Sequence, residues 1–419
     1  MIWKDDVVFL SEAMSDVPLQ AENQHISALQ KTILEDESGY AAFIPHDGTA
    51  EFFLILNSSE AHDFGHALEA LYSRFEGFLG SRKLSGGEIV FSRLYVSDIA
   101  NQDRQLTTSK LYLRLCSGAI SVIEQRPLNR CAIALFAYFA TPVLQKQLRN
   151  SGMAETRAPS QVLVVGKHYR MLWLANCVQP GLTDAKRQMD SILEHATLAM
   201  TEQGMRWLPN ALRSWIFIRD IDDNYLPMVQ SRRAFFESHG LTDQTRTLAS
   251  TGIEGRFAHP ESRVGMDLLC MDGLDTSQIS KMEAPECLSP ASQYGATFER
   301  GLRVDFGDRA HLHLSGTASI DQNGEILHTG NVEKQTQRTL ENLQALLLAQ
   351  GSSFSDLAYV LVYLRDASSL KIVRSKLQQH LPVDIPRLFL EAGVCRPGWL
   401  VEIEGLAFIS QQSQFKPFL

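Results

Sequence analysis

One order of elements occurs three times along the 419-residue chain. Its most recognisable part is an apolar strand that runs into a turn with an aspartate, seen as IVFSRLYVSD, NALRSWIFIRD and AYVLVYLRD. The three strands are about 120 to 150 residues apart, and each stands among further predicted strands and helices in a similar order. This repetition predicts three copies of one unit.

The last copy has the clearest pattern. Residues 303–321 alternate apolar and polar side chains, which is typical of a strand hairpin. Residues 332–351 have leucines at helical spacing and a closing glycine, Gly351. A strand within 355–366, a short helix at 368–381 and two final strands follow, which gives the order β-β-α-β-α-β-β.

We therefore predict an α+β fold of three tandem modules, with boundaries at 1–158, 159–288 and 289–419. Stretches rich in Pro and Ser, RAPSQ and EAPECLSPAS, mark the joins. Three similar modules in one chain can pack around a pseudo-threefold axis, with small-molecule clefts where neighbours meet. The alternative is one large α/β domain in which the repetition is accidental.

Composition narrows the classes of partner. The net charge is −9 and no block of Lys and Arg is present, which argues against a nucleic-acid surface. No apolar run of about 18 residues could span a membrane. Asp5 and Asp6 lie where a signal peptide needs apolar residues, so we expect a cytoplasmic protein.

The sequence shows no motif for a cofactor or a metal ion. Its six cysteines form no CxxC pair, and no group of His and Cys has the spacing of a zinc site. No GxGxxG or GxxxxGK[ST] loop is present to hold phosphates. We therefore expect neither a cofactor nor a metal, and Trp173, Trp207 and Trp215 are expected in the core.

The last module contains the densest set of candidate catalytic residues. Glu402 and Glu404 alternate along WLVEIEGLAFI, so their carboxylates share one face of a strand. Arg387 precedes Glu402 by 15 residues. An arginine beside a carboxyl can bind an anionic substrate group while the carboxyl moves a proton. The alternative is a surface ion pair.

This module resembles the Rid/YjgF family in SGTASID, QTQRTLENLQALL, YVLVYLRD, Pro386-Arg387 and VEIEGLA. The resemblance implies a trimeric β-α fold of enzymes that deaminate imines and enamines. It also implies that Arg387 holds the substrate, that Glu402 handles the proton, and that Tyr294 and Gly316 line the pocket. The chain departs from the family at Phe389, where a cysteine is usual.

The chorismatase branch of this superfamily is similar over about residues 160–410. The similar segments are SGTASI, CRPGWLVEIE, SWIFIRDI, YLPMVQSRRAFF and ASTGI. The resemblance implies cleavage of chorismate into pyruvate and a hydroxybenzoate or a dihydroxy-cyclohexadiene acid. Glu402 would be the acid, with its pKa raised by burial near Trp399. Cys395 would shape the ring pocket, or is simply a small buried side chain.

A dicarboxylate needs two cationic partners, and Arg246, Arg300 and Arg303 are the candidates beside Arg387. Arg232 and Arg233 lie on a predicted helix, where we expect at least one to face solvent. In the other modules Ala132 and Gly265 stand near the position of Glu402, and Arg246 aligns with Arg387. At most one cleft therefore has a full set of residues.

Three functions are consistent with these residues. The first is a chorismatase-like enzyme that releases pyruvate from chorismate or a related unsaturated carboxylate. The second is a Rid-type imine or enamine deaminase in a biosynthetic pathway. The third is a non-catalytic binding or scaffold protein. We expect an anionic small-molecule substrate, and a monomer or a small homo-oligomer.

Overall fold

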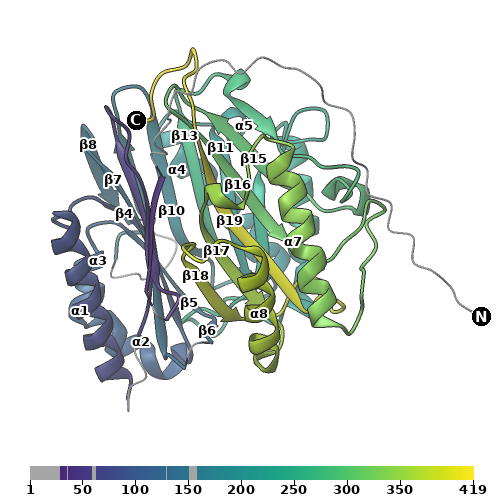
Figure 1. The fold of residues 1–419 in the computed structure, drawn as a ribbon, viewed down its shortest axis with the longest axis horizontal. Helices are drawn as coiled ribbons and strands as arrows, with labels where there is room; N and C mark the ends of the chain where they lie inside the picture. The colour runs from purple at the N-terminus through teal and green to yellow at the C-terminus, as the bar shows by residue number, and fades with distance from the viewer. Residues whose placement is uncertain (1–28, 35, 59–62, 129, 151–157) are drawn as a thin grey trace, which may run out of the picture.

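The computed structural model describes residues 29–34, 36–58, 63–128, 130–150 and 158–419, which form three mixed β-sheets flanked by helices (Figure 1). In spatial order, the first sheet contains β1 (Leu29–Ile33), β2 (Gly39–Phe43), β3 (Ala50–Asn57), β7 (Ile133–Thr141), β4 (Ile89–Val96) and β5 (Ala119–Glu124). The second contains β8 (Gln145–Arg149), β9 (Gln161–Val165), β10 (Arg170–Val178), β13 (Val264–Asp272), β11 (Ala211–Ile218) and β12 (Ala249–Glu254). The third contains β14 (Ile279–Lys281), β15 (Gly301–Asp305), β16 (Arg309–Thr317), β19 (Val401–Ser410), β17 (Leu357–Leu364), β18 (Arg387–Glu391) and β6 (Arg126–Pro127).

Apart from β6, the three sheets have the same order of strands, so the predicted repetition of one α+β unit is confirmed. With β6 left aside, the last two strands of each sheet are parallel to each other, and the remaining neighbours are antiparallel, as are β18 and β6. The predicted boundary at 158/159 separates β8 from β9, although these two strands pair. The boundary at 288/289 likewise separates β14 from its partner β15. We name the units modules 1, 2 and 3 by their sheets.

The helices lie on the outer faces of the sheets, and the inner faces of the three sheets meet in the centre (Figure 1). The helices are α1 (Phe64–Arg82), α2 (Ile99–Thr107), α3 (Lys110–Leu115), α4 (Ala185–Glu202), α5 (Trp207–Asn210), α6 (Ile221–Ser238), α7 (Val332–Leu348) and α8 (Leu370–His380). Asn331 caps α7 through the N–H of Lys334, and Gly351 adopts a φ of +70° just beyond its end, as its position predicted.

Main-chain pairing between modules closes the three units into a ring. Glu124 of module 1 bridges Arg256 of module 2, and Ile253 of module 2 bridges Val394 of module 3. The ring closes where β6, which precedes β7 in module 1, pairs with β18 of module 3. Each cleft is consequently built from two successive modules.

Two buried ion pairs repeat across these contacts. Arg93 of module 1 binds Asp267 of module 2 at 2.6 Å, and Arg213 of module 2 binds Glu404 of module 3 at 2.6 Å. All four side chains are at most 2% exposed. The two arginines occupy equivalent places in their modules. Each arginine pairs with a residue on the neighbouring strand of its own module, and that residue lies two positions after the one that corresponds to Asp267 or Glu404.

The third contact lacks this pair, because strand register puts Tyr359 and Ala134 at the corresponding positions. A different buried pair joins modules 3 and 1, in which Arg309 binds Glu51 at 2.7 Å. The ring is therefore only approximately threefold.

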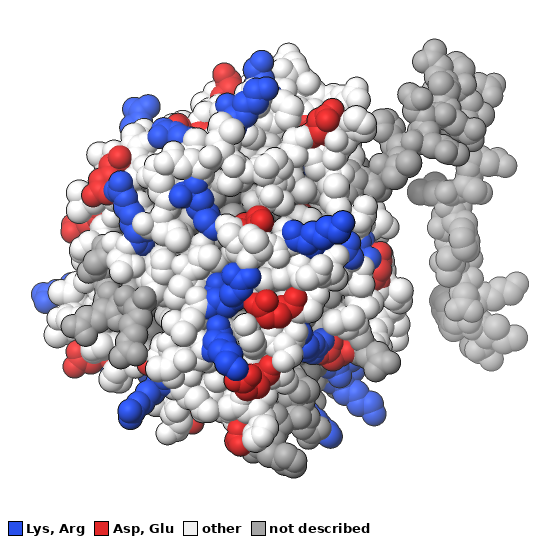
Figure 2. Space-filling view, turned by 90° about the vertical axis from the view of Figure 1, so that its left-hand side faces the viewer, with Lys and Arg blue, Asp and Glu red and all other residues white. Residues whose placement is uncertain are grey.

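Basic and acidic side chains are interspersed on the face that Figure 2 shows. Of the helices in the described ranges, none has both the length and the apolar character that crossing a membrane requires.

We expect Asp267→Asn to lower the free energy of unfolding by about 3–5 kcal/mol, because it leaves the Arg93 charge buried without its partner. Asparagine keeps the oxygen that accepts the N–H of Asn176. Urea unfolding measures the change. Asp272→Asn is the matched control, because its ion pair with Arg170 is 30–39% exposed, and its loss should cost at most about 1 kcal/mol. Equal losses of unfolding free energy in the two variants would contradict the expectation that the buried Arg93–Asp267 pair is the costlier one to break.

Candidate functional site

A small cavity lies between modules 2 and 3. Module 2 contributes Tyr225, Ser250 and Gly252, and module 3 contributes Phe298, Arg300, Gly316, Ala318, Cys395, Arg396, Trp399 and Glu402. The enclosed volume is about 30 Å³.

Glu402 is the carboxyl group of this cavity. It lies on β19 and is 4% exposed, and no hydrogen bond to its carboxyl is found among the described residues. Gly316 makes room for it, because a Cβ at that position would lie 2.0 Å from Oε1 of Glu402. Any other residue at 316 would therefore displace the acid.

Glu404 shares the face of Glu402 but has a different role. Its carboxylate accepts hydrogen bonds from Trp215 Nε1 and the Tyr363 hydroxyl, each at 3.0 Å, and from the Thr251 hydroxyl, in addition to binding Arg213. These bonds use its acceptor capacity, so Glu404 holds the two modules together, and Glu402 is the candidate for proton transfer.

Burial, together with the nearby Glu404 carboxylate, raises the pKa of Glu402 to about 8 against the opposing effect of Arg213 and Arg300. This is the direction that the sequence predicted. At neutral pH Glu402 is therefore mostly protonated and can serve as a general acid.

Three guanidinium groups surround the cavity. Arg300 and Arg396 line it, and they donate to the carbonyl oxygens of Ser289 at 2.8 Å and Gly324 at 3.0 Å. Arg232 stands behind Ser250, where Nη1 donates to the Ser250 hydroxyl at 3.2 Å and Nε to the Thr297 hydroxyl at 2.6 Å. In the described ranges Arg232 forms no ion pair with a carboxylate, although it is buried. The site is therefore positively charged and suited to an anion.

Tyr225 and Cys395 form another part of the wall. Tyr225 lies seven residues before Arg232, so both project from one face of α6. Its side chain hydrogen-bonds the Cys395 thiol, whose pKa burial raises to about 12. Cys395 is therefore a neutral thiol in the wall of the cavity.

The structure brings together four of the predicted site residues, Glu402, Gly316, Cys395 and Arg300. It places the other three arginines elsewhere. Arg246 donates to the carbonyl oxygens of Ala211 and Thr247. Arg303 binds Asp305 and Gln411. The Arg387 guanidinium donates to the carbonyl oxygens of Ile385 and Pro382. The backbone N–H of Arg387 donates to the carbonyl oxygen of Glu37 in module 1.

Strand register explains why Arg387 and Glu402 are apart. Arg387 pairs with Val360 on β17, and the equivalent pair in module 2 is Ser250 with Ser214. Ser250, not Arg246, is therefore the counterpart of Arg387, which corrects the sequence alignment. Each cleft combines the Arg387 or Ser250 position of one module with the Glu402 position of the next module. Arg387 therefore faces module 1, and Ser250 of module 2 faces Glu402 of module 3.

Arg396, Arg232 and Tyr225 are the site residues that sequence reasoning missed. Arg396 lies in the CRPGWLVEIE segment, and Tyr225 and Arg232 lie in YLPMVQSRRAFF. Both segments resemble the chorismatase branch, and this resemblance is the sequence signal that could have identified the three residues. Arg233 is exposed, as expected for one residue of that pair, and Arg232 is buried. Tyr294 lies in a short 3₁₀ turn (Ala291–Tyr294), but its side chain is outside what the structure describes.

The clefts on the other two sides differ. At the position of Glu402, module 2 has Gly265, and the Phe257 ring fills the space that a side chain there would take. Module 1 has Ala132. Within the described ranges no three His, Cys, Asp or Glu residues are grouped as a metal site.

Comparison with known proteins is consistent with this geometry. Residues 304–409 match the family of Endoribonuclease L-PSP, also called Rid/YjgF. This matched segment lies in module 3, which is therefore similar to the Rid/YjgF family. A 99-residue segment is 26% identical to the 3-aminoacrylate deaminase RutC of Acinetobacter baylyi, which covers 23% of this chain and 79% of that protein. A crystal structure of a chorismatase matches 86% of this chain and 98% of its own with a TM-score of 0.60 and 15% identity. The fold is therefore chorismatase-like.

The raised pKa of Glu402 predicts a pH-dependent stability. Between about pH 4.5 and 8 the folded chain keeps a proton that the unfolded chain releases, so the free energy of unfolding falls as pH rises. We expect Glu402→Gln to remove this loss, which is at most about 1.4 kcal/mol per pH unit. In urea unfolding from pH 5 to 9, the free energy of unfolding of the variant should rise relative to that of the wild type as pH increases. The exposed Glu283→Gln should show a constant difference, and the same constancy in Glu402→Gln would contradict the raised pKa.

Proposed function

We propose that this protein is a chorismatase-like enzyme that releases pyruvate from chorismate or a closely related unsaturated dicarboxylate. The observation that carries the proposal is the buried Glu402, whose pKa is raised by that burial, in a cavity lined by Arg300 and Arg396. The chorismatase-like fold and the resemblance of the CRPGWLVEIE segment support it.

The charges of the cavity fit a dianion. Two guanidinium groups at the wall can each bind one carboxylate, and the buried Arg232 adds positive charge behind Ser250. Glu402 contributes no negative charge while it is protonated. The Cys395 thiol and Trp399 offer an apolar surface to a ring.

The reaction begins with a proton from Glu402 to the terminal carbon of the enol ether, which places positive charge on the ether carbon. Water adds to that carbon and releases a proton; if a hydroxyl of the substrate adds instead, the cyclic ketal that forms is opened by water to the same hemiketal stage. The hemiketal formed with water then loses the ring oxygen as an alcohol, which leaves pyruvate. The proton released during addition returns to Glu402, so the acid is regenerated.

Substrate entry requires the wall to move. An enclosed volume of about 30 Å³ accommodates an ordered water, whereas small-molecule sites usually measure about 300–1,000 Å³. The wall side chains of Tyr225, Phe298, Cys395 and Arg396 are only half-buried, and of these we expect Phe298 and Arg396 to swing outward.

Imine or enamine deamination is the second candidate, because of the identity with 3-aminoacrylate deaminase. In that mechanism Arg387 clamps the substrate beside Glu402, yet its guanidinium is not part of the Glu402 cavity. The two reactions therefore differ in their dependence on Arg387. A purely binding protein would turn over neither substrate.

Incubation with chorismate and measurement of pyruvate tests the proposal. We expect Glu402→Gln to lower kcat by about 10²–10⁴-fold through loss of the acid. Arg396→Gln should raise KM about 10- to 100-fold through loss of a charged hydrogen bond to a carboxylate. Arg303→Gln is the matched control outside the cavity and should leave both constants within about twofold.

Arg387→Lys separates the two enzymatic functions. Pyruvate release should persist in this variant, whereas ammonia release from 2-iminobutyrate, if the wild type shows it, should be lost. No pyruvate from the wild type above the Glu402→Gln background would refute the proposal.

The pH dependence of kcat/KM gives a separate prediction. The acid must be protonated, so kcat/KM for pyruvate release should fall as pH rises through about 8. A profile that instead rises through this range would show that Glu402 acts as a base. Circular dichroism at each pH serves as the control for loss of folded protein.

A further inference from the structure

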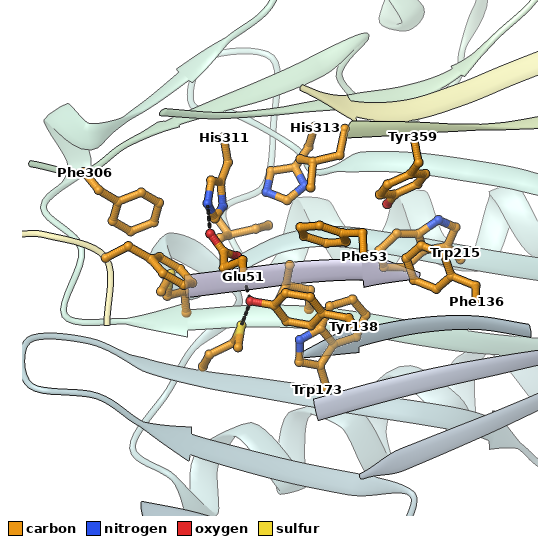
Figure 3. Close-up of a pocket in the computed structure, with 16 residues that line it drawn as sticks. Glu51, Phe53, Phe136, Tyr138, Trp173, Trp215, Phe306, His311, His313 and Tyr359 are labelled. Atoms are coloured by element: carbon orange, nitrogen blue, oxygen red, sulfur yellow. Dashed lines mark hydrogen bonds and ion pairs between the residues drawn. The ribbon is translucent and has the colours of Figure 1, made fainter. Parts of the chain in front are cut away.

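A second cavity lies at the centre of the molecule, where the three sheets meet (Figure 3). Module 1 contributes Phe53, Phe136 and Tyr138, module 2 Trp173 and Trp215, and module 3 His313 and Tyr359. Several of these rings stack, with centroids 4.8 Å apart for Phe53 and Tyr138 and 5.6 Å apart for Trp173 and Trp215. None of these residues lines the Glu402 cavity.

Among the residues that the structure describes, the indole N–H of Trp173 finds no hydrogen-bond partner, although its side chain is buried. An unsatisfied buried donor costs about 1–3 kcal/mol, which a ligand carrying an acceptor would recover. This donor is therefore one polar group of the cavity that a ligand can use, beside the His313 imidazole and the Tyr359 hydroxyl, for which no hydrogen bond is found among the described residues either.

The charged groups of the cavity are already balanced. Glu51 accepts from Arg309 at 2.7 Å and from the Tyr138 hydroxyl at 2.7 Å, and it binds His311 Nε2 at 2.9 Å (Figure 3). Burial holds the pKa of His313 well below its usual range, so this imidazole is neutral. A charged ligand would lack a counter-charge here, which favours an uncharged one.

Phe418 separates the central cavity from a larger one at the surface. Its ring lines both cavities, and the outer one measures about 330 Å³. The ring contacts Phe306 and His311 at centroid distances of 5.0 and 4.9 Å. The backbone N–H of Phe418 donates to the carboxylate of Asp308 at 2.9 Å. An aromatic side chain of the chain itself thus occupies the entrance.

Two glycines allow the segment 415–419 to lie this close. A Cβ on Gly307 would lie 2.5 Å from the carbonyl oxygen of Phe415, and one on Gly166 would lie 2.3 Å from that of Leu419. Gly307 also donates to the carbonyl oxygen of Lys416 at 2.7 Å. The segment is therefore seated against two separate modules, and its detachment would open the central cavity.

We propose that the central cavity binds a planar, uncharged aromatic molecule with one hydrogen-bond acceptor, whose ring replaces that of Phe418 and whose acceptor binds Trp173. The closed cavity holds only about 30 Å³, so Phe418 must move outward before such a molecule enters. This site is independent of the proposed function.

Calorimetric titration of the full chain with acetophenone and with ethylbenzene tests the proposal. The two probes have similar size, and only acetophenone has an acceptor. We expect wild type to bind acetophenone about 3- to 10-fold more tightly, and Trp173→Phe to abolish the difference while keeping the ring. Phe418→Ala should tighten the binding of both probes. Acetophenone should also speed hydrogen exchange of the Phe418 amide.

Phe415→Ala is the matched control, because this ring belongs to the same segment and lines neither cavity. It should leave both affinities unchanged. Absence of saturable binding in both wild type and Phe418→Ala would overturn the proposal. So would equal preference for acetophenone in wild type and Trp173→Phe, because that result places the probe elsewhere.

Discussion

The buried ion pair between Arg213 and Glu404 is the contact on which the candidate site depends. It joins modules 2 and 3, and its carboxylate is saturated by bonds from Trp215, Tyr363 and Thr251. Because Glu404 is fixed in this way, Glu402, two residues earlier on the same face of β19, is held at the opening between the modules. A buried pair of this kind gives little net stability but makes misplacement of either partner costly.

The same ion pair shapes the chemistry of its neighbour. The Glu404 carboxylate adds to the effect of burial and raises the pKa of Glu402. Arg213 is engaged by Glu404, which leaves Arg300 and Arg396 to face the cavity. A neutral acid and cationic walls therefore arise from one arrangement of charges at a module interface. The equivalent contact between modules 1 and 2 has the ion pair of Arg93 with Asp267 but has Gly265 in place of the acid. The clefts therefore differ in whether they contain an acid.

Much of the fold could be predicted from the sequence, and less of the site. The recurrent strands predicted three α+β modules, because alternation and helical spacing are local properties of the chain. The predicted boundaries separate β8 and β14 from the strands with which they pair, since short edge strands carry too few residues to show a period. Glu402, Gly316, Cys395 and Arg300 were found from their segments, whereas Arg396 and Arg232 stand in segments that were noted for their resemblance but were not themselves recognised as site residues.

The sequence by itself determined the repetition, the strand that carries Glu402 and the absence of an acid at Ala132 and Gly265. Only the tertiary structure decided which residues share a cleft. Arg387 and Glu402 belong to one module and are close in sequence, but successive modules supply the two halves of each cleft. Ser250 of module 2 therefore faces Glu402, and Arg387 faces module 1. The partner of a residue at such an interface depends on how the modules close into a ring, which no local pattern encodes.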